Sequence, residues 1–204
     1  MVLVGHSLGA YAGLLAAAAH PDLFSRLVLI DGGLSMTLPA ELDPDTVLDA
    51  TLGPWIERLR RTYSSEEEYL EVFRTHPALA ETWGPDLETY ARYDIAGGPG
   101  AVRSRVAVEA VRQDGREALT RAADLALAWD TLAVPTLLVL APKGMLGQPP
   151  GLMPAQAVAD AHRRRPDIPV ETIAEANHST LLLDPRYATT VARRISDPTS
   201  WPRP

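Results

Sequence analysis

Short apolar runs separated by helical patterns predict a parallel sheet with crossover helices. Residues 26–31 read RLVLID and residues 135–140 read PTLLVL, and a weaker run, IPVETI, spans residues 168–173. Apolar runs of this length bounded by Gly or Pro are typical of strands buried on both faces, which occur in parallel sheets. Helical spacing follows the last two runs at residues 154–165 and 185–195. The chain is therefore predicted to be an α/β protein.

About one hundred residues separate the first two runs, and their apolar positions have helical rather than alternating spacing. We expect no strand there, and we interpret Gly97–Gly100 as a hinge or linker. Helices inserted between sheet strands form a cap over the carboxyl ends of the strands, where α/β sites lie. The expected helices span residues 45–61, 64–75, 86–93, 101–112 and 116–128.

The predicted organisation has a core interrupted by this insertion. Residues 1–33 and 131–196 form the core, residues 34–130 form a helical cap or lid, and residues 197–204 form a tail. The tail is rich in proline, so it is expected to fray.

The motif at residues 5–9, GHSLG, carries the candidate chemistry. It follows an apolar run and precedes a helical run over residues 8–19, and G-x-S-x-G in this context indicates the nucleophile elbow of a serine hydrolase. The sharp turn exposes Ser7, crowding calls for small residues at the flanks, which Gly5 and Gly9 supply, and the Leu8 amide faces a developing oxyanion. The alternative is a strand–helix turn with an incidental serine. His6 is interpreted as a packing or hydrogen-bonding neighbour of the serine.

A serine nucleophile needs a base, and His178 is the candidate. It lies in the loop EANHS at residues 175–179, after the third apolar run, and in an alternating sheet this loop emerges at the same edge as Ser7. The order of elbow, strand, cap, strand and final ANHSTLLL segment resembles the α/β-hydrolase fold superfamily over nearly the whole chain. The resemblance implies that Ser7 is the nucleophile and His178 the general base.

The triad acid departs from the family pattern. It usually follows the strand at residues 135–140, but no Asp or Glu occurs from residue 131 to 159. Some superfamily members place the acid after the preceding strand, where Asp31 stands, and we assign it this role. The alternatives are that Asp31 only caps the following loop, that Asp160 is a weaker candidate, or that the acid is absent.

Composition limits the partners and the compartment. The 204 residues carry a formal charge of −7 and no cysteine, which argues against a general nucleic-acid surface and excludes disulfides. Neither a signal peptide nor a membrane span is visible in the sequence, so a cytoplasmic location is the default expectation. We find no motif for a metal, phosphate or dinucleotide, and we expect no cofactor.

The elbow stands unusually near the start of the chain. The resemblance implies that several strands and helices, and a second oxyanion donor, precede the elbow, so we expect the chain to be a fragment. The run at residues 2–4 would then be an exposed apolar edge strand that invites self-association.

The favoured function is hydrolysis of an ester-like or related acyl bond in a small to medium, partly apolar molecule. Thioester and carbon–carbon bond hydrolysis stay open. The alternative is a non-catalytic relic, or a half-domain that requires a partner chain. Aromatic residues of the predicted cap could line a pocket, although packing is the simpler role for each: Trp55, Tyr63, Tyr69, Phe73, Trp83, Tyr90 and Tyr93.

Overall fold

A parallel four-stranded sheet forms the centre of the molecule in the computed structural model, which describes residues 1–39 and 41–203. Residues 40 and 204, in the predicted cap and tail, lie outside the described residues. The strands are β1 (Val2–His6), β2 (Arg26–Ile30), β5 (Thr136–Leu140) and β6 (Val170–Thr172). Their order in the sheet is β1-β2-β5-β6. Leu3 of β1 pairs with Leu27 of β2, and Val28 of β2 pairs with Leu137 of β5. The predicted α/β class is confirmed.

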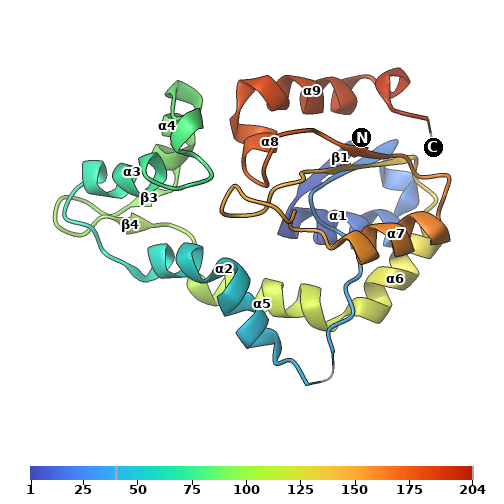
Figure 1. The fold of residues 1–204 in the computed structure, drawn as a ribbon, viewed down its shortest axis with the longest axis horizontal. Coiled ribbons are helices and arrows are strands. Elements are labelled where there is room, and N and C mark those ends of the chain that lie inside the picture. Colours follow the sequence, from blue (N-terminus) through green and yellow to red (C-terminus); the bar gives the residue numbers. More distant parts are fainter. Residues whose placement is uncertain (40, 204) are drawn as a thin grey trace.

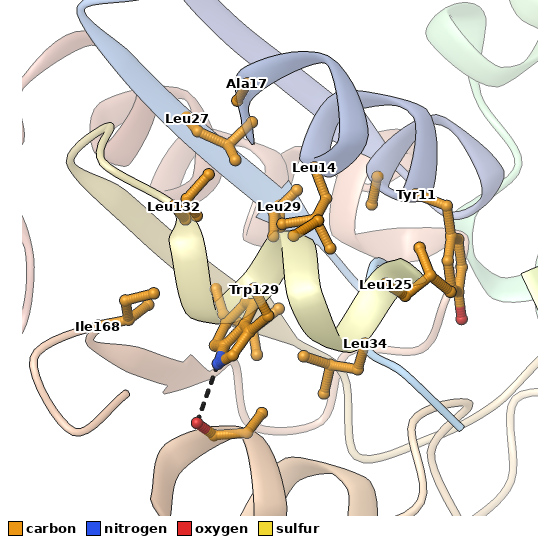
Figure 2. Close-up of a cluster of buried hydrophobic side chains, with 14 of the residues drawn as sticks. Tyr11, Leu14, Ala17, Leu27, Leu29, Leu34, Leu125, Trp129, Leu132 and Ile168 are labelled. Atoms are coloured by element: carbon orange, nitrogen blue, oxygen red, sulfur yellow. Dashed lines mark hydrogen bonds between the residues drawn. The ribbon is translucent and has the colours of Figure 1, made fainter. Parts of the chain in front are cut away.

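Helices cover both faces of the sheet (Figure 1). One face packs against α1 (Leu8–Ala19), α6 (Ala122–Thr131) and α7 (Ala155–Arg164). Figure 2 shows Leu14 of α1 and Trp129 of α6 lying against Leu29 of β2. The Trp129 indole N–H also donates to the carbonyl oxygen of Ala161 at 3.0 Å, so this buried donor has a partner.

The opposite face packs against α8 (Thr180–Leu183) and α9 (Pro185–Ser196). Val28 and Ile30 of β2 point to this face, whereas their neighbours Leu27 and Leu29 point to the other. Burying a side chain of this size stabilises the fold by roughly 1.5–3 kcal/mol. Burial on both faces explains why these strands read as continuous apolar runs rather than as alternating patterns.

A separate aromatic cluster forms between β2 and β5 in sequence. It joins α2 (Pro44–Arg60), α3 (Glu66–Arg74), α4 (Pro85–Tyr93) and β4 (Arg103–Ser104), with β3 (Ile95–Ala96) beside them and α5 (Val108–Thr120) packed on α2. We call residues 44–120 the aromatic cap; its α3, α4, β3 and β4 lie to one side of the sheet (Figure 1). The buried residues of the cluster are Tyr63, Tyr69, Leu70, Phe73, Leu79, Leu87, Ala91 and Val102. Tyr90 and Tyr93 are exposed.

The expectation that this region lacks strands is wrong. β3 and β4 pair antiparallel, and Tyr63 bridges Val102 beside them. Gly97 and Gly100 have φ values of 87° and 78°, which glycine adopts easily. The stretch interpreted as a hinge is therefore the turn of a short hairpin.

Two of the predicted helices have the wrong bounds. The predicted segments 101–112 and 116–128 correspond to α5, Val108–Thr120, and α6, Ala122–Thr131. Gly115 lies inside α5 rather than between helices. A Cβ there would approach the Leu48 side chain to 2.7 Å. The glycine allows α2 and α5 to pack closely, and α6 packs on the sheet instead of in the aromatic cap.

The tail is packed over its described residues, contrary to the expected fraying. Residues Pro198–Ser200 form a short 3₁₀ helix, as do Pro21–Leu23 and Ala80–Thr82. The Trp201 indole N–H donates to the Arg194 carbonyl oxygen at 2.7 Å, and its ring packs on the apolar cluster under α9. This aromatic anchor outweighs the proline content.

β1 lies at one edge of the sheet in the described part of the chain. Val4 in this strand is 39% exposed, while Leu3 packs partly on the core. Among the helices of residues 1–39 and 41–203, none is long and apolar enough to cross a membrane.

Candidate active site

Ser7 occupies the sharp turn between β1 and α1. Its backbone has φ 56° and ψ −124°, a conformation that residues with a side chain rarely adopt. The Ser7 N–H donates to the Ile30 carbonyl oxygen at 2.9 Å, which ties the turn to the neighbouring strand. The strained turn places the hydroxyl at the carboxyl end of the sheet.

Glycines make room for this turn, but not at both expected positions. A Cβ at Gly5 would lie 2.2 Å from the Gly9 carbonyl oxygen, so the expected crowding at position 5 is confirmed. A Cβ at Gly9 would meet nothing within 4 Å, so the expected crowding at position 9 is wrong. The second crowded position is Gly32, where a Cβ would lie 2.4 Å from the Ser7 carbonyl oxygen. Gly32 follows β2 and is recognisable in sequence only as a strand end.

His178 lies within hydrogen-bonding distance of the serine. Its Nε2 is 3.0 Å from the Ser7 Oγ, and the residue is only 3% exposed. The His178 N–H donates to the Lys143 carbonyl oxygen at 3.0 Å, which joins this loop to the loop after β5. The loop reaches the same sheet edge as the elbow, as the alternating topology predicts.

Asp31 is the carboxylate that faces His178. It follows β2 with φ 46° and is fully buried, and its Oδ2 lies 2.7 Å from His178 Nδ1. Its Oδ1 accepts from the Ala141 N–H at 3.2 Å. A carboxylate on Nδ1 selects the tautomer in which Nε2 is free to accept the Ser7 hydroxyl proton. Asp160 lies in α7, where its carboxylate accepts from Gln156 at 2.8 Å.

His6 supports the main chain of His178. Its Nε2 lies 2.9 Å from the His178 carbonyl oxygen, to which it donates, and the two rings are 4.5 Å apart. Burial, and then the neighbouring His178, lower the pKa of His6 from 6.5 to about 4. The ring is therefore neutral at pH 7, and its contact is that of the hydrogen-bonding neighbour expected from the sequence.

Asn177, which sequence reasoning missed, joins the His178 loop to the aromatic cap. Its Nδ2 donates to the Ala78 carbonyl oxygen at 2.8 Å. Its Oδ1 accepts from the N–H groups of Ser179 and Thr180 at 3.0 and 2.9 Å. An Asn that precedes Ser and Thr at a helix start is the signal that could have found this role.

Leu8 begins α1, where the first N–H groups have no partner within the helix and the helix dipole is positive. A cavity of about 290 Å³ opens beside it between α1, α5 and α6, lined by Leu8, Gly9, Tyr11 and Leu125 among others. A larger cavity of about 710 Å³ lies against α7, and its lining contains none of Ser7, Asp31 and His178. Within the described residues, no three His, Cys, Asp or Glu side chains group as metal ligands would.

Comparison with known proteins gives a family and several relatives. A family model described as the alpha/beta hydrolase family matches residues 2–193. The 2-(acetamidomethylene)succinate hydrolase of Mesorhizobium japonicum is 28% identical over 177 residues, which are 87% of this chain and 57% of that protein.

Solved structures share the fold. The structure of E-2-(acetamidomethylene)succinate hydrolase superposes with a TM-score of 0.71 at 24% identity, over 96% of this chain and 66% of that one. The thioesterase domain from the curacin biosynthetic pathway gives a TM-score of 0.70 at 16% identity, with the same coverage of 96% and 66%. The chain thus spans less than two thirds of the length of these relatives.

Proposed function

The chain belongs to the alpha/beta hydrolase family, and from this premise we propose that it is a serine hydrolase that cleaves an acyl bond. The observation that carries the proposal is the hydrogen-bonded series from Asp31 through His178 to Ser7, with steps of 2.7 and 3.0 Å. Proton transfer requires a base within about 3 Å of the hydroxyl, and the 3.0 Å distance from His178 Nε2 to Ser7 Oγ satisfies this requirement.

The proposal gives each group a role. His178 Nε2 takes the proton from the Ser7 hydroxyl as its oxygen attacks the substrate carbonyl. The Leu8 N–H donates to the oxyanion, and Asp31 stabilises the imidazolium without itself becoming protonated. His178 then gives the proton to the leaving group. A water molecule, deprotonated by His178, hydrolyses the acyl–Ser7 ester and regenerates the serine.

The proposed substrate is a small to medium acyl compound. Relatives of the chain are named for hydrolysis of 2-(acetamidomethylene)succinate and as a thioesterase domain. An ester, thioester or acylamide bond is accessible to the same serine chemistry, because each reacts through a tetrahedral oxyanion. Leu183 of α8, the helix that follows the His178 loop, packs against the aromatic cluster of the cap.

Labelling with a fluorophosphonate probe tests the proposal. Wild-type protein is expected to be labelled at Ser7, and Ser7→Ala is expected to lose the label. Ser196→Ala is the matched control, because Ser196 is an exposed serine at the end of α9.

A folded wild-type protein that is not labelled would contradict the proposal. That result would favour the alternative of a non-catalytic half-domain that requires a partner chain. The observation that favours this alternative is the edge position of β1 in the described part of the sheet, with Val4 39% exposed.

A further inference from the structure

The aromatic cap contains four buried side-chain nitrogen atoms without a hydrogen-bond partner among the described residues, and three of them belong to neighbouring side chains. These three are Trp55 Nε1, Arg58 Nε and His76 Nε2. Buried polar groups are almost always paired, because a buried group without a partner has lost its hydrogen bonds to water and has gained none in exchange. Three such atoms in neighbouring side chains therefore call for an explanation.

All three atoms are donors. An indole nitrogen and an arginine Nε carry a hydrogen and cannot accept. The His76 Nδ1 lies 3.2 Å from the Ala78 N–H and accepts from it, so the proton of the neutral ring is on Nε2. Burial, and then the charge of Arg58, lower the pKa of His76 and favour this neutral form.

The donors are close together and one of them is fixed. The Trp55 and His76 rings are 4.6 Å apart, and the Arg58 guanidinium carbon lies 5.1 Å from the centre of the Trp55 ring. Arg58 Nη1 donates to Asp94 at 2.6 Å and to the Tyr69 hydroxyl, and its side chain is only 10% exposed. These contacts use the outer nitrogen of the guanidinium and leave Nε without a partner.

The cluster belongs to the part of the aromatic cap that touches the His178 loop. His76 is two residues from Ala78, a span of at most about 7 Å, and the Ala78 carbonyl oxygen accepts from Asn177, the neighbour of His178. Thr82 adds a second contact, a hydrogen bond of 3.0 Å from its hydroxyl to Asp184. The three donors therefore lie in the part of the aromatic cap that is attached to the loop carrying His178.

We propose that Trp55, Arg58 and His76 form a subsite that binds a carboxylate group of the substrate, which rests on the function proposed above. A carboxylate is an acceptor only, and its two oxygens can accept from several donors. The positive charge of Arg58 strengthens these bonds, and the neighbouring Phe73 ring excludes water from them. The rings of Trp55 and His76 are partly exposed, whereas their N–H groups are buried. Binding therefore requires the rings to turn their N–H edges toward the ligand.

Two esters of equal acyl length test the subsite. Mono-4-nitrophenyl glutarate ends in a carboxylate, whereas 4-nitrophenyl pentanoate ends in a methyl group. Wild type is expected to have the higher kcat/KM for the glutarate. Trp55→Phe, which removes the N–H and keeps an aromatic ring, is expected to lower that value about tenfold and to leave the pentanoate within about twofold.

His76→Asn is the second variant, because Asn can still accept from the Ala78 N–H but lacks a donor at Nε2. It is expected to act as Trp55→Phe does. Trp83→Phe is the matched control, since Trp83 is a cap tryptophan that packs under Arg74. Trp83→Phe should leave kcat/KM unchanged for both esters. Equal losses on both esters, or no loss in Trp55→Phe and His76→Asn, would overturn the subsite.

Calorimetry with the uncleaved half-ester separates the subsite from the proposed catalysis. Ser7→Ala protein is expected to bind mono-4-nitrophenyl glutarate about tenfold more tightly than Ser7→Ala/Trp55→Phe does. If wild type hydrolyses neither ester, the proposed function fails, and this binding difference still decides the subsite. Equal binding by the two proteins, or none, overturns it.

Discussion

The sheet and the aromatic cap satisfy their buried polar groups differently. Two tryptophans illustrate this: Trp129 on the sheet donates to Ala161, whereas Trp55 in the aromatic cap has no partner among the described residues. Every buried side-chain atom found without a partner in residues 1–39 and 41–203 belongs to the aromatic cap, Arg112 Nε being the fourth. The sheet is built from paired groups and aliphatic packing, which favours stability, while the aromatic cap keeps donors available for a ligand.

The largest expected effect lies at the sheet. Asp31→Asn removes the carboxylate that orients His178, and we expect it to lower kcat by about 10⁴. Turnover of 4-nitrophenyl acetate measures the effect. Asp160→Asn serves as a control, because Asp160 is on the surface of α7 and contacts Gln156 and Arg163. Near wild-type turnover in Asp31→Asn would show that another group orients the histidine.

Removing a buried leucine from each region comes next. Leu29→Ala in β2 is expected to lower the free energy of unfolding of the whole molecule by about 3 kcal/mol, because it leaves a cavity in a closely packed face. Leu87→Ala creates a cavity within the cap cluster. We expect amide hydrogen exchange in Leu87→Ala to be faster than in wild type only within residues 44–120. Equal loss of protection in the sheet would show that the two regions unfold as one unit.

The two regions also differ in their response to acid. The folded pKa of His6, about 4, lies below its unfolded value of 6.5, so the unfolded state binds the proton first. Stability is retained above pH 6.5 and falls by up to about 3 kcal/mol as the pH drops to 4. His6→Asn removes the titrating ring and is expected to lose this part of the acid sensitivity in urea unfolding series.

The pKa of His76 in the aromatic cap is lowered in the same direction. His76→Asn is therefore expected to reduce the acid sensitivity too, and by less than His6→Asn does. A larger change for His76→Asn, or the same pH dependence in His6→Asn as in wild type, would show that His6 is not the main source of the acid sensitivity.

Glycine substitutions give the smallest expected effects, with opposite signs. A Cβ at Gly32 would press on the Ser7 carbonyl oxygen, so Gly32→Ala is expected to lower the free energy of unfolding by about 2 kcal/mol. A Cβ at Gly53, inside α2, meets nothing within 4 Å, and Gly53→Ala is expected to raise the free energy of unfolding by up to about 1 kcal/mol. Thermal unfolding measures both, and a stabilising Gly32→Ala would contradict the close backbone approach.

The sequence predicts the sheet well and the aromatic cap poorly, for physical reasons. β2 and β5 are buried on both faces, so their apolar runs alone identify them. β3 and β4 have two residues each, and their pairing depends on contacts such as the Tyr63–Val102 bridge, which no local pattern encodes. The break between α5 and α6 falls at Arg121, without the glycine or proline that usually marks such a break.

Some residues of the candidate site could likewise be predicted from the sequence, whereas others could not. The positions of Ser7, Asp31 and His178 after predicted strands are enough to expect them at one sheet edge, and the structure brings them within hydrogen-bonding distance. Gly32 and Asn177 could not be assigned, because their roles depend on the Ser7 and Ala78 carbonyl oxygens, which are distant in sequence.

The contact between Asn177 and Ala78 has a consequence for protein engineering. Because the acceptor is a main-chain carbonyl oxygen, the contact depends on the path of the backbone at residue 78 rather than on a side chain. The side chains of the aromatic cap can therefore be redesigned for a new ligand while the attachment to the histidine loop is retained. A transplanted cap would need to reproduce one backbone position, rather than a particular sequence, to remain seated beside the catalytic chemistry.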